Sequence, residues 1–307
     1  MKTPNIRHLN PMLQMFVLFG LIFITLFLVM LLGKLIADWG YGINLLDPDF
    51  AKDPSAEGVT AVQRWLMVLN QLGFFLIPAL LFGQMMYSGE QSYFPLRKPN
   101  LMQFGLAIVL VFAMQAPIDF LLRLNSSLPL GDEVMSDINE MEVKAAFMIK
   151  QLIGEGSFAD VAIAMIVLAI IPAIAEEFFF RGVLLQTFRA SFRSAHLAIW
   201  MTAIVFSFIH MQFLGFIPRM LLGALLGYIM VWSGSIWLSI IVHFFNNALG
   251  VFLLFQFDDE VITNPQQAET NWLMLAVGSL FTIGTIYFFH RFRLNEQSDQ
   301  EPFNTFE

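Results

Sequence analysis

Apolar runs long enough to cross a lipid bilayer recur along the whole chain and leave little sequence between them. A transmembrane helix needs about 20 consecutive, mostly apolar residues. Such spans are helical because hydrocarbon offers no partners for backbone polar groups. Only 13% of the 307 residues are charged, whereas soluble domains carry about 25%. The pattern therefore predicts an all-α, polytopic membrane protein.

We interpret about eight of these runs as transmembrane helices. Gly223 and Gly227, in the sixth run, have the spacing that allows close contact between helices. A further stretch, 134–153, carries apolar residues at helical spacing and is acidic at its start, so we expect an amphipathic helix on the protein or at the interface. The predicted spans are 12–36, 65–86, 101–122, 158–188, 197–210, 215–231, 236–255 and 272–289.

The charges between the spans predict the orientation of the protein in the membrane. An even number of spans places both ends of the chain on one side. By the positive-inside rule the basic side is cytoplasmic, and the short loops favour a bacterial inner-membrane protein. The basic residues on the side of the termini are Lys2, Arg7, Arg97, Lys98, Arg189, Arg193, Arg291 and Arg293; the opposite acidic clusters are Asp47, Asp49 and Asp53, then Asp132, Glu133 and Asp137, then Asp258, Asp259 and Glu260.

The spans occupy most of the chain, so no second globular domain is expected. We divide the chain into 1–157 (three spans and the amphipathic helix), 158–255 (spans four to seven) and 256–307 (the last span and a polar tail from Leu294, expected to be disordered). No basic stripe points to a nucleic-acid partner. The chain has no cysteine, which excludes disulfides, thiolate metal sites and a cysteine nucleophile.

Three charged residues fall inside the fourth span, where each costs about 2.5–3.5 kcal/mol at the bilayer centre. Glu177 and Arg181 are four apart and can pair on one helix face. Glu176 lies about 100° around the helix, so it stays free for chemistry. Pro172, one turn earlier, can kink the helix. A purely structural ion pair is the alternative, and the second, adjacent glutamate makes it less favourable.

Two histidines, His210 and His243, lie in later spans, and Asn247 shares a helix face with His243. A lone histidine in a span is more often a packing residue than a ligand. Two of them, with an asparagine and a spare glutamate, suggest chemistry. A glutamate with a raised pKa is a general base for water, and the histidines can hold a metal or polarise a carbonyl. We therefore predict a site for peptide hydrolysis.

Three motifs in order, each in a span, resemble those of the CPBP family of intramembrane proteases. This family includes the type II CAAX prenyl endopeptidases and bacterial abortive-infection and bacteriocin-immunity proteins. The resemblance covers about 158–255, and the signatures His-Glu-x-x-His, Gly-x-Ser-x and Gly-x-Gly-Asp of other intramembrane proteases are missing. The motifs are Glu176-Glu177-x-x-x-Arg181, Phe206-x-x-x-His210 and His243-x-x-x-Asn247.

The resemblance implies an intramembrane endopeptidase with an eight-helix core and a polar cavity open towards the cytoplasm. Its substrates would be peptides or membrane proteins, and the lipid bilayer its surroundings. The implied roles are water activation by Glu176 and binding of the oxyanion, or of a metal, by His210, His243 and Asn247, with Glu177 and Arg181 in support.

Three questions stay open at this point. Zinc would be held by Glu176, His210 and His243, but one glutamate, two histidines and an asparagine make a poor tetrahedral zinc set, which favours metal-free chemistry. A non-catalytic scaffold or immunity protein of the same fold is the second reading, although a scaffold has no need of these residues. A proton-coupled transporter is the third, and the chain shows no internal repeat of the kind common in transporters.

Overall fold

The structure, a computed structural model, describes residues 5–47, 58–87, 92–129, 131–154, 157–256 and 270–299. These residues form helices and include no β-strand. Seven helical segments are long and apolar enough to cross a membrane, and an eighth, α10, is apolar but shorter. The predicted all-α, polytopic architecture is confirmed. The helices are α1 (Pro11–Ile36), η1 (Ala37–Tyr41), α2 (Val59–Gln71), η2 (Leu72–Leu76), α3 (Ile77–Met85), α4 (Leu101–Ala113), α5 (Gln115–Ser126), α6 (Asp132–Ile153), α7 (Phe158–Ala164), η3 (Met165–Ile170), α8 (Ile171–Glu177), η4 (Phe178–Leu184), α9 (Leu185–Phe192), α10 (Ala195–Phe208), α11 (Phe216–Ser233), α12 (Ile236–Gln256) and α14 (Trp272–Asp299).

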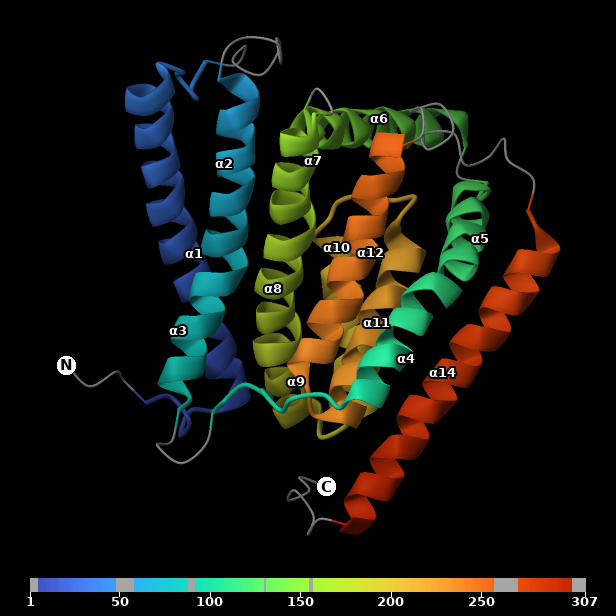
Figure 1. The fold of residues 1–307 in the computed structure, drawn as a ribbon. Helices are drawn as coiled ribbons and strands as arrows, with labels where there is room; N and C mark the ends of the chain where they lie inside the picture. Colours follow the sequence, from blue (N-terminus) through green and yellow to red (C-terminus); the bar gives the residue numbers. More distant parts are fainter. Residues whose placement is uncertain are drawn as a thin grey trace.

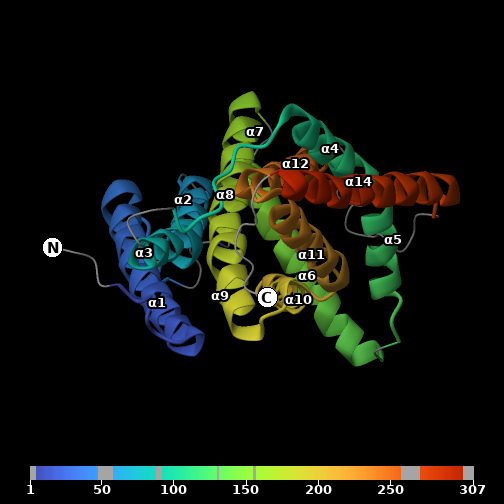
Figure 2. The same cartoon turned by 90° about the horizontal axis from the view of Figure 1, so that it is seen from below.

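One long helix runs through the middle of the molecule and separates two groups of helices (Figures 1 and 2). It joins α7, η3, α8, η4 and α9 into a continuous segment of 35 residues. Helices α1, α2 and α3 lie on one side of it. Helices α10, α11 and α12 lie on the other side, with α4, α5 and α14 beyond them (Figure 2). The charged residues of the fourth span are therefore in the centre of the protein and not at its lipid-facing surface.

Wider, π-helical turns precede two of the membrane prolines. A proline in a helix lacks an N–H group, and its ring crowds the carbonyl one turn earlier. The segment η2 leads into Pro78 and η3 leads into Pro172. The predicted kink at Pro172 is thus accommodated by a π-helical segment, and the helix continues past it. A third such segment, η4, begins directly after Glu177 and contains Arg181; π-helical turns are frequent at functional sites.

Helix α6 lies across one end of the bundle, transverse to the spans, as expected for the predicted amphipathic helix (Figure 1). Arg64 of the second span fixes its C-terminus by donating to the carbonyl oxygens of Leu152 and Ile153, both at 2.9 Å. The same guanidinium pairs with Asp160 of α7 at 2.9 Å. Helix α6 is therefore tied to spans two and four. Its exposed apolar side chains are Val134, Met141, Val143, Phe147 and Met148.

Helix α1 begins on the side of the bundle opposite to α6, and helix α14 ends on that same side (Figure 1). The connection before α4, which contains Arg97, lies at this end and contacts the turn between α11 and α12. Ile236 donates to the carbonyl oxygen of Pro95 at 2.9 Å, and Leu96 forms an isolated bridge with Ser235. The protein is thus an integral membrane protein with these helix ends on one side, whereas the cytoplasmic orientation remains a prediction.

Several observed helix ends differ from the predicted ones. The second span begins at Val59 and not at residue 65, because polar residues of its first turns contact α6. The fifth span ends at Phe208, so His210 lies in the turn that follows. Helix α14 continues to Asp299, so residues 294–299 are helical where disorder was expected. The acidic residues Asp49, Asp53, Asp258, Asp259 and Glu260, the basic Lys2 and the tail residues 300–307 lie outside the described residues.

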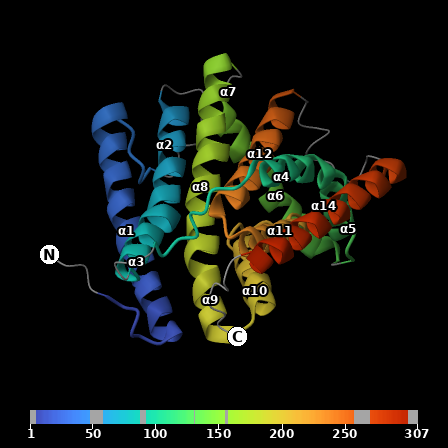
Figure 3. The same cartoon turned by 60° about the horizontal axis from the view of Figure 1, so that its bottom comes forward.

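Gly73 lets α1 lie directly against the second span (Figure 3). The Thr25 hydroxyl donates to the Gly73 carbonyl oxygen at 2.6 Å. A Cβ atom at position 73 would lie 2.1 Å from Val29 Cγ2 and 3.2 Å from the Leu26 Cα atom. The two helices therefore approach at a distance that only glycine permits.

We expect Gly73→Val to lower the free energy of unfolding by about 1–3 kcal/mol, the usual cost of overpacking. Thermal and chemical unfolding in detergent would measure it. The matched control is Gly105→Val in α4, where nothing lies within 4 Å of an added Cβ. An equal loss of stability in both variants would contradict the close approach at Gly73.

Candidate active site

The fourth span carries a buried ion pair at the junction of α8 and η4. Arg181 Nη1 lies 2.5 Å from Glu177 Oε1, and both side chains are fully buried. Arg181 Nη2 donates to the Gly223 carbonyl oxygen in α11 at 2.8 Å. The guanidinium also lies 5.0 Å from the ring centre of Phe206. The predicted pair is therefore present, and it joins the fourth span to α11 and α10.

His243 of α12 lies between the two adjacent glutamates. Its Nδ1 atom is 2.9 Å from Glu177 Oε1, and its Nε2 atom is 3.8 Å from Glu176 Oε2. A carboxylate can only accept, so Nδ1 carries the proton and donates to Glu177. In the neutral ring, Nε2 is then an acceptor that faces Glu176. Glu177 thus fixes both the orientation and the tautomer of His243.

Glu176 is held from the second span by a residue that the sequence reasoning missed. Gln71, the last residue of α2, donates from Nε2 to Glu176 Oε1 at 3.0 Å. Both side chains are buried, at 4% exposure. Glu176 Oε2 is buried and has no hydrogen-bond partner within the described part of the chain. The only sequence signal for Gln71 was its position as a polar residue inside an apolar span, which is a sign of function in a membrane helix.

His210 reaches the same region from the turn after α10. Its Nδ1 atom is 2.7 Å from the Phe206 carbonyl oxygen, so this nitrogen also carries a proton and Nε2 is left as an acceptor. The Phe206 ring centre lies 5.0 Å from that of His210 and 5.8 Å from that of His243. The phenylalanine of this motif is therefore the packing surface that both histidines share.

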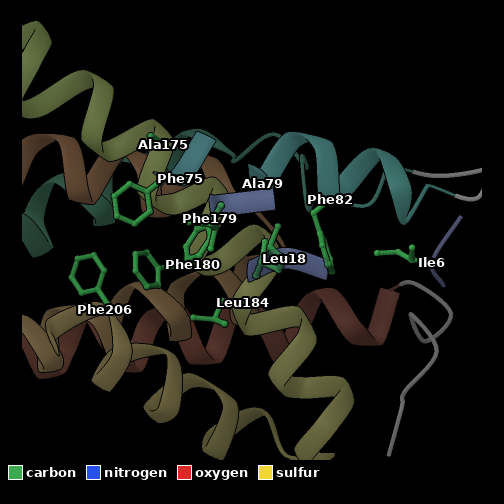
Figure 4. Packing of buried hydrophobic residues seen from close by; sticks show 12 residues of the cluster. Ile6, Leu18, Phe75, Ala79, Phe82, Ala175, Phe179, Phe180, Leu184 and Phe206 are labelled. Atoms are coloured by element: carbon green, nitrogen blue, oxygen red, sulfur yellow. The ribbon is translucent and has the colours of Figure 1, made fainter. Parts of the chain in front are cut away.

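Aromatic side chains of the second, fourth and fifth spans pack together beside the ion pair (Figure 4). Phe180 packs edge-on against Phe206 with ring centres 5.0 Å apart. Phe75 from the second span packs edge-on against Phe179 at 5.4 Å. Apolar rings keep the effective dielectric constant low, which strengthens the attraction between Arg181 and Glu177 beside them.

Asn247 lies one helical turn after His243 on α12 and is half-buried. Its side-chain amide has no hydrogen-bond partner among the residues described. The amide is therefore available to a ligand, and its role stays a prediction. The predicted cavity open towards the cytoplasm also stays a prediction.

The residues suggested as zinc ligands do not form a metal site. Glu176 and His243 approach each other, but no group of three or more His, Cys, Asp or Glu side chains in the described residues has the arrangement of a metal centre. His210 and His243 pack against the same Phe206 ring, but His210 does not complete such a group with Glu176 and His243. The metalloprotease reading therefore has no support in this structure.

Comparison with protein families identifies the segment that holds the three motifs. Residues 158–249 match the model described as type II CAAX prenyl endopeptidase Rce1-like. This segment is similar to the Rce1-like family. The match confirms the resemblance inferred from the motifs and supports, at the family level, a CAAX-protease-like membrane endopeptidase. Gln71 lies outside the Rce1-like segment. Neither the curated proteins nor the solved structures compared with the chain gave a match.

We expect Arg181→Met to lower the free energy of unfolding by about 3–5 kcal/mol, because it leaves the charge of Glu177 buried without its partner. Adding Glu177→Gln should restore part of this loss. Equilibrium unfolding in detergent would measure both effects.

The matched control is Arg123→Met, which removes the 2.9 Å pair with the exposed Asp119. We expect this change to cost at most about 1 kcal/mol. If Arg181→Met cost no more than Arg123→Met, the buried pair would not have the structural importance assigned to it.

Proposed function

We propose that the protein is an intramembrane endopeptidase that hydrolyses peptide bonds of membrane-associated proteins or peptides with a water activated by Glu176. One observation carries the proposal. Glu176 Oε2 and His243 Nε2 face each other at 3.8 Å in a buried site. Gln71 and Glu177 hold the opposite atoms of these two side chains.

This arrangement suits a water molecule that donates one hydrogen to each acceptor. Glu176 and His243 Nε2 would receive its two O–H groups, which leaves an oxygen lone pair directed away from both. The lone pair attacks the scissile carbonyl carbon while Glu176 takes one proton. Glu176 then passes that proton to the amide nitrogen, and the C–N bond breaks. This releases the amine and the carboxylic acid and restores the Glu176 carboxylate.

The histidines have a different role here from the one that the family resemblance implies. Each neutral ring uses its only N–H group on a protein acceptor, Glu177 for His243 and the Phe206 carbonyl for His210. Neither ring can then donate to an oxyanion unless it gains a second proton. Asn247, with its available amide, is the neutral side chain proposed to donate to that oxygen.

We also propose a bacterial inner-membrane location with both termini cytoplasmic. The basic residues at the end where α1 begins and α14 ends support this orientation through the positive-inside rule. The proposed partners are a peptide or membrane-protein substrate and the lipid bilayer.

We expect Glu176→Gln to lower kcat by about 10²–10⁴-fold, the usual contribution of a general base. The assay is cleavage of a peptide library by the purified full-length protein, followed by mass spectrometry. The matched control is Glu140→Gln, which changes an exposed glutamate paired with Lys144 on α6. Equal cleavage by wild type and Glu176→Gln would rule out the proposed role of Glu176.

We expect Gln71→Leu to lower kcat by about 10–100-fold on the same peptides, because a hydrogen bond to a charged group is worth about 1.5–3 kcal/mol. A Gln71→Leu variant as active as wild type would show that Gln71 does not position Glu176.

A zinc chelator added to the wild-type assay tests metal dependence. Activity that survives the chelator supports the water-activating glutamate alone, and activity that needs added zinc would contradict it.

A further inference from the structure

Arg219 occupies a position that stability alone does not favour. It lies in the first turn of α11, close to the positive end of the helix dipole. The helix is one of the apolar segments that can cross the membrane. A cation in such a segment is costly and is usually directed to a functional partner.

The guanidinium of Arg219 is only partly satisfied by the protein. Its Nη2 atom donates to Gln212 Oε1 at 2.8 Å. Its Nη1 atom is buried and has no hydrogen-bond partner in the described parts of the chain. Glu142 of α6 accepts from the Leu214 backbone N–H at 3.0 Å and from Gln212 Nε2 at 3.3 Å, and no hydrogen bond joins it to Arg219 in the described residues. Arg219 thus keeps a positive charge and a free donor.

The fold brings Arg219 next to the turn that carries His210. The Ser207 hydroxyl donates to the Phe216 carbonyl oxygen at 2.6 Å, which closes the turn between α10 and α11. Gln212, the partner of Arg219, follows His210 by two residues in that turn. The hydrogen bond between Gln212 and Arg219 therefore ties the guanidinium to the turn that carries His210.

Both histidines donate to protein acceptors. Arg181 uses its two Nη atoms on Glu177 and Gly223, and its Nε atom is buried without a hydrogen-bond partner in the described residues. Arg219 is the second arginine of this region with a donor left over. We propose that Arg219 Nη1 binds a negatively charged oxygen of the substrate. The inference rests on the proposed peptidase function. Two oxygens of this kind exist, the oxyanion formed at the scissile carbonyl and a free carboxylate of the substrate. Arg219 keeps its protons and contributes hydrogen bonds and charge only.

The first test measures anion binding and needs no turnover. Inorganic phosphate is the probe, and the thermal unfolding temperature of the full-length protein in detergent is the readout. Phosphate should raise this temperature for wild type, Arg219→Lys and the control Arg123→Gln, which changes an arginine paired with Asp119 on α5, but not for Arg219→Gln. No rise in wild type, or the same rise in Arg219→Gln, would overturn the proposal.

The second test identifies the oxygen with cleaved peptides that end in a free carboxylate or in an amide. If Arg219 binds the oxyanion, Arg219→Gln should lower kcat by about 10²–10³-fold on both peptides. If Arg219 binds the free carboxylate, Arg219→Gln should raise KM on the free-acid peptide alone. Arg219→Lys should keep part of the lost activity in either case. Kinetics identical to those of Arg123→Gln on both peptides would overturn the proposal.

The two tests separate this inference from the proposed function. If wild type cleaves and Glu176→Gln does not, the peptidase function stands whatever Arg219→Gln does. If no peptide is cleaved, the peptidase function fails, and the phosphate measurement still decides whether Arg219 binds an anion. A purely structural Arg219 would lose activity only in proportion to lost stability, so the unfolding temperatures of all variants without phosphate provide that comparison.

Discussion

A single carboxylate oxygen, Glu177 Oε1, holds the centre of the structure together. It accepts from Arg181 on its own helix and from His243 on α12. Through Arg181 it is also connected to the backbone of α11. Burying these charges is costly, and their mutual attraction offsets the cost only in good geometry. The arrangement of three helices around Glu177 is therefore tightly constrained, and the position of Glu176 follows from it because the two residues are adjacent.

The same bonds decide what each imidazole can do. His243 and His210 are both anchored through Nδ1, one by a carboxylate and one by a backbone carbonyl. In the neutral form each ring therefore presents an acceptor nitrogen, and the donors for a negative oxygen then come from other side chains. This division between acceptors and donors gives Asn247 and Arg219 their proposed places in the chemistry.

The sequence predicted what depends on neighbours along one helix. The Glu177–Arg181 pair, the apolar spans and the amphipathic helix α6 all follow from helical spacing. Contacts between distant segments could not be predicted, because the spacing of residues along one helix does not indicate which helices pack together. Gln71 donates to Glu176, which lies 105 residues later in the chain. His243 donates to Glu177 and not to Glu176. The π-helical segments were also missed, since a proline alone indicates a kink and not how the helix absorbs it.

The contact between Gln71 and Glu176 joins the segment that matches the family model to a span outside it. The carboxylate lies in the Rce1-like segment, and the amide that donates to it lies in the second span, before that segment begins. The second span thus contributes to the surroundings of Glu176 and does more than anchor the chain in the bilayer. A chimera that carries the Rce1-like segment behind foreign spans would keep all three motifs but leave Glu176 without the amide that holds it.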